Sequence, residues 1–209
     1  MAAPKEIEIK FLVSDPKALQ TRLTQSGFRC VTPATHESNT LYDLPGQTLR
    51  RKGELLRLRQ YGDIWTLTHK ARAKAGKYKS RVELETVVSD GPRTGQLLCA
   101  LGYQPVFTYE KFRSEWSDGR GHVVLDHTPI GDVAEIEGPP RWIDATAKAL
   151  GITTAAYITK SYAELFFEWK RKYKRKAKDM TFRECSGRAN SRSTSTRKSS
   201  AEAEAGSGV

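Results

Sequence analysis

The sequence predicts an α+β fold in which antiparallel strands close into an eight-stranded barrel, with helices packed on its outside. Three observations support this prediction. Seven segments alternate polar and apolar residues with the period of two that is typical of strands, and an eighth alternates less clearly. Four intervening segments carry helix signals. The charged residues of the strands gather on one face, which leaves an apolar face for the helices.

The predicted strands are short alternating runs, most of them ended by turn signals such as Asp118-Gly119. They cover residues 6–13, 36–44, 55–61, 65–71, 77–88, 106–116, 122–128 and 132–138. The segment 36–44 is the weakest of the eight. Helices are predicted between them because aspartate and proline precede two apolar segments and glycine follows three. The predicted helices cover residues 16–26, 91–101 and 141–150, with a fourth that starts near residue 157 and runs into a basic segment.

Charge is distributed unevenly along the 209 residues. The net charge is +11, and the residues from Lys170 onward carry 12 basic and 4 acidic side chains, a balance of +8. We therefore expect residues 1–169 to form one domain and residues 170–209 to be a basic tail, disordered beyond about residue 178. We expect this tail to be solvated, with weak binding to nucleic acid or an anionic surface as the alternative.

Two further features predict a cytoplasmic protein. No segment reaches the roughly 18 to 20 apolar residues that span a membrane, and the N-terminal residues lack the apolar core of a signal peptide. The three cysteines are far apart and lack a CxxC spacing, which disfavours a disulfide framework or a zinc site.

The charged faces carry the functional prediction. Glu6, Glu8 and Lys10 share one face of their strand because residues two apart point to the same side. On a single strand this pattern is typical of a sheet with one solvated face. Five strands carry such same-face charged pairs, however, and the helices need the apolar face. We therefore expect the charged faces to line the inside of a closed barrel.

The predicted interior holds seven acidic and seven basic side chains. The acidic residues are Glu6, Glu8, Glu83, Glu85, Asp126, Glu135 and Glu137, and the basic residues are Lys10, Arg57, Arg59, Lys70, Arg81, Lys111 and Arg113. A dry core would not tolerate them, because each buried ion costs several kcal/mol, so a water-filled tunnel is expected. Carboxylates bind hard cations such as Mg²⁺ or Mn²⁺, and arginine and lysine bind phosphate oxygens. The mixture predicts a site for a metal-bound polyphosphate.

These motifs resemble the CYTH superfamily, also called triphosphate tunnel metalloenzymes. EIEIK matches the ExExK signature of the family, and the similarity continues through LRLR, THK, ELE, EKFR, VVLD, AEIE and TKSYAEL, over about residues 5–167. The resemblance implies an eight-stranded antiparallel tunnel, a small-molecule triphosphate substrate and Mg²⁺ or Mn²⁺ as cofactor. The family includes class IV adenylyl cyclases, thiamine triphosphatases, inorganic tripolyphosphatases and RNA triphosphatases.

The resemblance also implies a role for each matched residue. The expected metal ligands are Glu6, Glu8, Glu135 and Glu137, with Asp126 as a further candidate. The expected triphosphate-binding residues are Lys10, Arg57, Arg59, Lys70, Lys111 and Arg113, with Lys160 closing over the substrate. The expected catalytic residues are Glu83, Glu85 and Lys70, where the glutamates bind a second metal or orient a water. Arg81 is expected to be a structural ion-pair partner.

Three functions share this set of residues. We favour hydrolysis of inorganic tripolyphosphate or a related organic triphosphate. A class IV adenylyl cyclase is the second possibility; there we expect an Arg-Asp-Phe-like insertion, whereas Leu-Pro-Gly-Gln follows Asp43 here. A non-catalytic module that binds polyphosphate or nucleic acid is the third. The carboxylates disfavour it, because a pure anion binder gains nothing from acidic residues unless metal is present.

Overall fold

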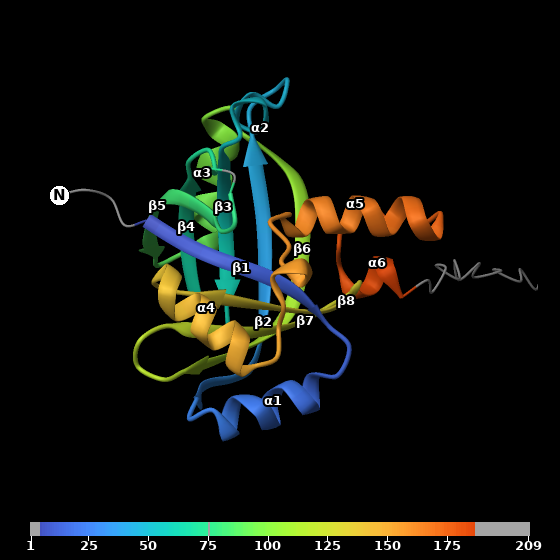
Figure 1. Ribbon diagram of the computed structural model, residues 1–209. Helices are drawn as coiled ribbons and strands as arrows, with labels where there is room; N and C mark the ends of the chain where they lie inside the picture. Colours follow the sequence, from blue (N-terminus) through green and yellow to red (C-terminus); the bar gives the residue numbers. More distant parts are fainter. Residues whose placement is uncertain (1–4, 75, 187–209) are drawn as a thin grey trace, which may run out of the picture.

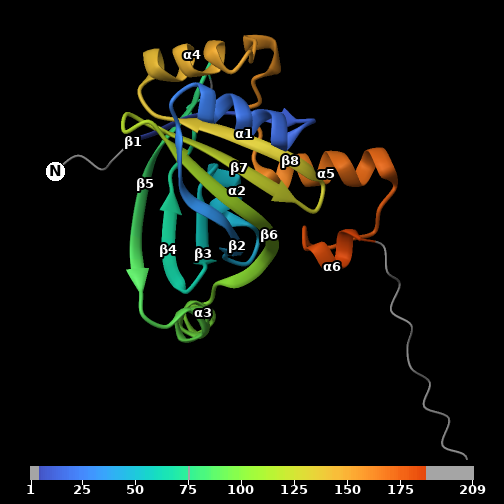
Figure 2. The ribbon, with the colours of Figure 1, turned by 90° about the horizontal axis from the view of Figure 1, so that it is seen from below.

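The computed structural model describes residues 5–74 and 76–186, and in them eight antiparallel strands close into a barrel (Figures 1 and 2). The order of the strands around the barrel is β1-β5-β4-β3-β2-β6-β7-β8. Their bounds are Lys5–Val13 (β1), Arg29–Asp43 (β2), Leu55–Tyr61 (β3), Ile64–Lys70 (β4), Lys79–Val88 (β5), Gln104–Ser117 (β6), His122–Thr128 (β7) and Gly131–Glu137 (β8). The predicted fold class and all eight predicted strands are confirmed.

The barrel closes because β1 pairs with β5 on one side and with β8 on the other. Closure leaves no open sheet edge. Strand β2 begins at Arg29, earlier than the predicted start at residue 36. Its first half pairs with β6 through irregular steps between Cys30 and Thr32 and between Thr32 and Thr35. Such irregularities interrupt the period of two, so the alternation of this segment could not reveal its first half.

The predicted helices at 16–26, 91–101 and 141–150 are confirmed as α1 (Pro16–Gln25), α3 (Gly91–Ala100) and α4 (Pro140–Ala149). The fourth helix, α5 (Tyr162–Tyr173), begins later than residue 157 because Ser161 caps it and forms a capping box with Glu164. Two short helices, α2 (Thr48–Lys52) and α6 (Phe182–Cys185), were not predicted. In the described part of the chain, no helix has the length and apolar character needed to cross a membrane.

The helices cover much of the apolar outer face of the barrel, as the charge pattern predicts, but Val82 and Leu84 of β5 stay 41% and 57% exposed. Helices α1 and α4 lie on one side of it (Figure 2), where Leu19, Leu23 and Ile143 pack with Ile9 and Phe11 of β1. A separate cluster lies under α3, and a third joins α5 to β6. Because these contacts bury the apolar faces, the opposite faces of the same strands point into the barrel.

The predicted tail is folded over its first part, so that prediction is wrong for residues 178–186. Met180 is fully buried and joins the cluster of α5 and β6. Its N–H donates to the carbonyl of Thr108, and its carbonyl accepts the N–H of Glu110. A composition with few apolar residues predicts disorder, but here Met180 and its two backbone hydrogen bonds bind the segment to β6, together with hydrogen bonds from Thr108 N–H to Asp179 and from Phe182 N–H to Glu110. Residues 187–209 lie outside the described residues.

Glycine at position 91 is required where α3 packs on the barrel. A Cβ there would overlap the indole ring of Trp65. Gly91→Ala is therefore expected to lower the free energy of unfolding by about 1–3 kcal/mol, as overpacking typically does. Urea denaturation measures the change. Gln96→Ala, on the exposed face of the same helix, is the control and should stay within about 0.5 kcal/mol. An unchanged denaturation midpoint for Gly91→Ala would contradict the packing.

Candidate active site

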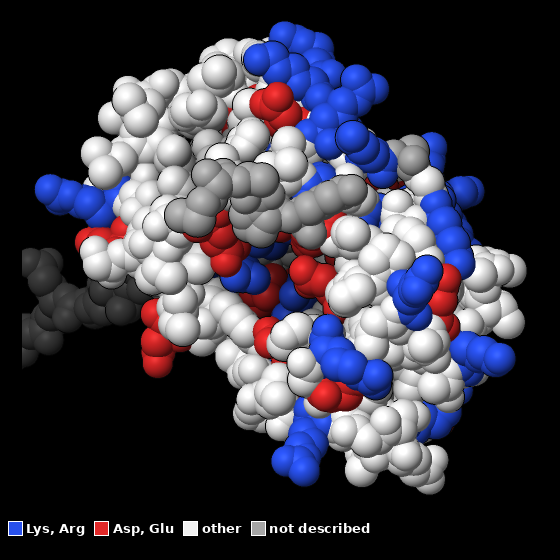
Figure 3. Space-filling model, turned by 60° about the vertical axis from the view of Figure 1, so that its left-hand side comes forward, with Lys and Arg blue, Asp and Glu red and all other residues white. Residues whose placement is uncertain are grey.

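The inside of the barrel is a cavity of about 300 Å³ whose lining is dominated by charged side chains. Figure 3 shows a hollow in the surface with acidic and basic atoms at its bottom. Six acidic residues line the cavity: Glu6, Glu8, Glu83, Glu85, Glu135 and Glu137. Eight basic residues line it as well: Lys10, Arg57, Arg59, Lys70, Lys79, Arg81, Lys111 and Arg113. Fourteen residues were expected as metal ligands, triphosphate-binding residues or catalytic residues. Twelve of them line this cavity, all except Asp126 and Lys160. The surplus of basic over acidic lining residues suits an anion.

One wall of the cavity, formed by β1 and β8, concentrates negative charge. The register places Glu8 directly opposite Glu137, and like charges in this position repel each other. Glu137 forms no ion pair with any of the described residues. Burial, followed by the charges of Glu6, Glu8 and Glu135, raises the pKa of Glu137 to about 7. The negative charge of this wall is therefore not fully neutralised by the described residues.

The chemistry of this wall fits Mg²⁺ or Mn²⁺, because these cations prefer carboxylate oxygens. Among residues 5–74 and 76–186, no three side chains already form a metal cage. Instead Lys10 neutralises part of the wall: its ammonium group pairs with Glu135 and lies 3.7 Å from Glu8. Lys79 lies 3.2 Å from Glu8. A cation at Glu8 and Glu137 would therefore compete with these lysines for the carboxylates.

Two carboxylates beside this wall share one lysine and differ in proton affinity. Lys70 Nζ lies 2.9 Å from Glu6 and 2.6 Å from Glu83. Burial acts to raise the pKa of Glu6, but Lys70 outweighs it and the pKa falls to about 2. Burial raises the pKa of Glu83; Lys70 opposes this rise and the charge of Glu6 adds to it. Glu83 is therefore the better proton acceptor of the pair. Arg81 pairs with Glu6 at 3.4 Å, as expected of an ion-pair partner.

On the β3 side, Glu85 holds two guanidinium groups next to each other. Its carboxylate lies 3.4 Å from Arg57 and 3.1 Å from Arg59. The hydroxyl of Thr68 donates to the same carboxylate at 2.6 Å. The Nε group of Arg59 donates to the hydroxyl of Thr66 at 3.1 Å. These contacts orient the two arginines toward the position that Glu85 now occupies, and a phosphate group could take the same place.

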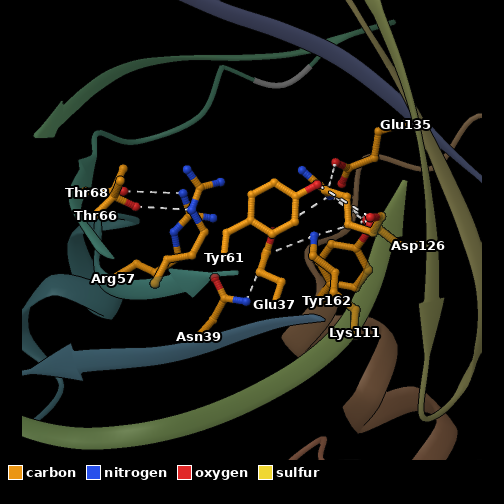
Figure 4. A network of polar contacts seen from close by, with 12 residues as sticks. Glu37, Asn39, Arg57, Tyr61, Thr66, Thr68, Lys111, Asp126, Glu135 and Tyr162 are labelled. Atoms are coloured by element: carbon orange, nitrogen blue, oxygen red, sulfur yellow. Dashed lines mark hydrogen bonds and ion pairs between the residues drawn. The ribbon is translucent and has the colours of Figure 1, made fainter. Parts of the chain in front are cut away.

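On the β6 side, the buried acids Glu37 and Asp126 contact Lys111 (Figure 4), and both also pair with Arg113. Lys111 Nζ lies 3.3 Å from Glu37 and 3.0 Å from Asp126. Arg113 donates two hydrogen bonds of 2.7 Å to Asp126 and one of 2.7 Å to Glu135. Asp126 was expected as a further metal ligand, but it is fully buried and does not line the cavity. Lys111, Arg113 and Tyr162 occupy its oxygens, which favours a positioning role over metal ligation.

Lys160 was expected to close over the substrate, and the structure places it elsewhere. Its ammonium group pairs with Glu168 of α5 at 2.6 Å, and about half of its side chain is exposed. The residues that follow it, from Ser161 to Ala163, line the cavity instead. The capping box at Ser161 turns the chain into α5 at this point, which directs the start of the helix toward the cavity and leaves Lys160 at the surface.

Five residues of the site were not predicted. Lys79 lies two residues before Arg81 and could have been found by the period of two. Glu37 and Asn39 are fully buried on β2, where the alternation was weak. Tyr109 and Tyr162 line the cavity and stack with ring centroids 5.8 Å apart. Nothing in the sequence pattern distinguished these tyrosines from core residues.

The CYTH domain model matches residues 4–179, most of the chain. The adenylate cyclase CyaB of Aeromonas hydrophila is 26% identical over 175 residues, which cover 77% of this chain and 87% of the relative. A solved structure from Vibrio parahaemolyticus, provisionally named an adenylate cyclase, has a TM-score of 0.71 at 23% identity and covers 79% of this chain and 99% of that one.

A second solved structure, from Hippeastrum, belongs to a provisionally named adenylyl cyclase that is described as having a dominant triphosphatase activity. It has a TM-score of 0.59 at 20% identity and covers 78% of this chain and 95% of that one. At these identities the two structures show a shared fold. Together with the domain match over residues 4–179 and the closed barrel lined with charge, they lead to one conclusion: this protein belongs to the CYTH domain family.

Proposed function

We propose that this protein is a divalent-metal-dependent enzyme that hydrolyses a triphosphate, either inorganic tripolyphosphate or a related organic triphosphate, inside the barrel. One observation carries the proposal. The cavity holds a wall of carboxylates on β1 and β8, where Glu137 has no positive partner among the described residues, together with guanidinium groups on β3 and β6. A pure anion site has no use for the first group, and a pure cation site has no use for the second. A metal-bound triphosphate uses both.

The basic residues would bind and orient the phosphate chain. Arg57 and Arg59 present adjacent guanidinium groups, and Arg113 faces them from β6. The Nε group of Arg57 is buried and has no hydrogen-bond partner among the described residues, so it has a donor to offer a phosphate oxygen. In this state Glu85 occupies the same guanidinium groups. Substrate binding would exchange these ion pairs for pairs with phosphate.

The expected metal ligands fit this scheme. Glu6, Glu8, Glu135 and Glu137 would hold Mg²⁺ or Mn²⁺ on the β1–β8 wall. A bound cation supplies Lewis acidity and offsets negative charge on the phosphate oxygens. The lysines that pair with these glutamates, Lys10 and Lys79, would then be free to contact phosphate.

Proton transfer is assigned to Glu83. Its raised pKa suits a group that accepts a proton from an attacking water, and Lys70 orients its carboxylate. The water oxygen forms a bond to a terminal phosphorus and gives its proton to Glu83, the bridging P–O bond breaks, and the arginines stabilise the pyrophosphate or organic diphosphate that leaves with the bridging oxygen. Glu85, which lies beside Arg57 and Arg59, is assigned to positioning.

Adenylyl cyclase activity is the second candidate, and the name of the Aeromonas hydrophila relative favours it. In that reaction the ribose 3′-hydroxyl of ATP attacks the α-phosphorus and pyrophosphate leaves. The same triphosphate-binding residues serve both reactions. We call this set the triphosphate clamp: Lys10, Arg57, Arg59, Lys70, Lys111 and Arg113. Asp43 precedes the segment where we expected a cyclase to carry an insertion. Its carboxylate accepts hydrogen bonds from the N–H groups of Leu44, Leu49 and Arg50, and so it binds the first turn of α2.

A substrate panel distinguishes the candidates. We expect purified protein with Mg²⁺ or Mn²⁺ to release phosphate from tripolyphosphate or from thiamine triphosphate, and chelation to stop the reaction. Phosphate, pyrophosphate and cyclic AMP are measured in parallel, with ATP as the third substrate. Cyclic AMP as the main product would replace hydrolysis by the cyclase reaction. Triphosphate binding that is unaffected by chelation, without any turnover, would support the non-catalytic module instead.

A further inference from the structure

Tyr162, the first residue of α5, contacts three strands of the barrel at once. The ammonium group of Lys10 on β1 lies 5.1 Å from the centre of its ring, and that of Lys111 on β6 lies 4.8 Å from it. Its hydroxyl donates a hydrogen bond to Asp126 on β7. The side chain is buried but lines the cavity. Figure 4 shows Tyr162, Lys111 and Asp126 directed toward one another.

Both lysines belong to the predicted triphosphate clamp, and both are almost inaccessible to solvent, with 3% and 2% of their side chains exposed. Two buried ammonium groups near one another repel each other. The negative face of an aromatic ring attracts a cation within about 6 Å, and this attraction is larger where water is excluded. The ring of Tyr162 therefore stabilises the positions of Lys10 and Lys111 independently of their acidic partners. This matters because those acidic partners, Glu135 and Glu8 for Lys10, are the expected metal ligands.

The position of Tyr162 is set from outside the barrel. The capping box at Ser161 fixes the start of α5, and Phe166, one turn further on, is fully buried against Phe107 of β6. The segment around Met180 hydrogen-bonds to β6 beside them. The ring of Tyr162 also stacks on Tyr109. With its backbone and its ring both held, Tyr162 is a fixed support for the long side chains of Lys10 and Lys111.

We propose that Tyr162 is a positioning residue of the triphosphate clamp. Its ring places the ammonium groups of Lys10 and Lys111, and its hydroxyl places Asp126, which in turn holds Arg113. The inference rests on the proposed triphosphate function and adds to it: docking of α5 outside the barrel determines the geometry of three phosphate-binding side chains inside it.

Three variants test this proposal by calorimetric titration with tripolyphosphate, in chelator and again with Mg²⁺. Tyr162→Phe keeps the ring and loses only the hydroxyl, and Asp126 still accepts hydrogen bonds from Lys111 and Arg113, so we expect the dissociation constant to rise no more than about 3-fold. Tyr162→Leu loses the ring under both lysines, and we expect a rise of about 10- to 30-fold. Phe166→Leu removes a ring from the same helix without contacting the clamp. We expect it to lower the melting temperature as Tyr162→Leu does but to leave tripolyphosphate binding within about 2-fold.

The outcomes separate the two proposals. If Tyr162→Leu binds tripolyphosphate like the wild type, the positioning role alone is overturned. If Phe166→Leu loses as much binding as Tyr162→Leu, the positioning role is also overturned, because the loss then comes from general loosening of α5. Wild-type protein that binds no triphosphate in either condition would overturn the proposed function and the positioning role with it. If Tyr162→Leu fails to fold, Tyr162→Met takes its place, because methionine fills a similar volume without an aromatic face.

Discussion

Glu137→Gln is expected to reduce metal-dependent turnover by at least about 100-fold while making the metal-free protein more stable. The loss of activity follows from removing a carboxylate of the proposed metal site, since even outer-shell partners of a metal are worth about 10- to 100-fold. The gain in stability follows from the register, which places Glu137 opposite Glu8 without a positive partner among the described residues. A residue kept for function at a cost in stability behaves in this way.

The gain depends on pH in a defined direction. The pKa of Glu137 rises from an ordinary value of 4.5 to about 7 in the folded protein, so ionisation of this group disfavours folding. Below pH 4.5 the group is protonated in both states and the substitution changes no charge. The cost of ionisation builds up as the pH rises from 4.5 to about 7 and is constant above that. Because Glu137 is partly exposed, screening reduces the gain to about 1 kcal/mol.

Urea denaturation in chelator, at pH 4.5 and at pH 8, measures this difference, and turnover with Mg²⁺ measures the activity. Glu168→Gln is the matched control, because Glu168 is half-buried on α5 and pairs only with the surface residue Lys160 among the described residues. It should change neither quantity. A Glu137→Gln protein that retains wild-type turnover would remove Glu137 from the metal site, and one that is destabilised at pH 8 would contradict the repulsion at the β1–β8 wall.

Lys111→Met is expected to have the largest effect on stability, a loss of about 3 kcal/mol or more. Lys111 lies between Glu37 and Asp126, whose side chains are both fully inaccessible to solvent. Burial acts to raise the pKa of Glu37, but Lys111 and then Arg113 outweigh it and hold that pKa far below its usual value. Without the lysine, Arg113 is the one ion-pair partner left to both buried carboxylates among the described residues, and breaking a buried pair from one side typically costs about 3–5 kcal/mol.

The free energy of unfolding at pH 7 measures this loss, and a second variant identifies its cause. Lys111→Met combined with Glu37→Gln should recover part of the stability, because the second change removes a carboxylate that the first leaves unpaired. Lys160→Met is the control: its ion pair with Glu168 is exposed, so the change should stay within about 0.5 kcal/mol. A double variant no more stable than Lys111→Met would show that lost packing, and not the unpaired charge, accounts for the effect.

The inward orientation of the charged residues could be predicted because it depends on local periodicity. Glu6, Glu8 and Lys10 point to one side of any extended strand, whatever that strand pairs with. The location of the acidic wall of β1 and β8 could not be predicted in this way. Its negative charge arises because Glu8 faces Glu137, although the 128 residues 9–136 lie between them in the chain, and no single segment contains that register.

Asp126 and Lys160, which do not line the cavity, show the same limit. Asp126 alternates correctly with its neighbours, yet three side chains from β6 and α5 surround it and remove it from the cavity. Lys160 follows the family pattern, yet the capping box at Ser161 leaves it at the surface beside Glu168. The folded segment 178–186 was missed because its composition is polar, whereas the contacts of Met180 with β6 depend on a strand far away in the sequence.

By itself, the sequence determined that this protein is a barrel of alternating strands and which charged faces of those strands point inward. Alternation and side-chain chemistry are local properties and can be read from neighbouring residues. The tertiary structure alone decided which charges pair, which carboxylates lack a partner, and that Tyr162 lies beneath two lysines of the clamp. These depend on strand register and helix docking, where residues distant in the sequence meet and the net balance of charge and burial is set.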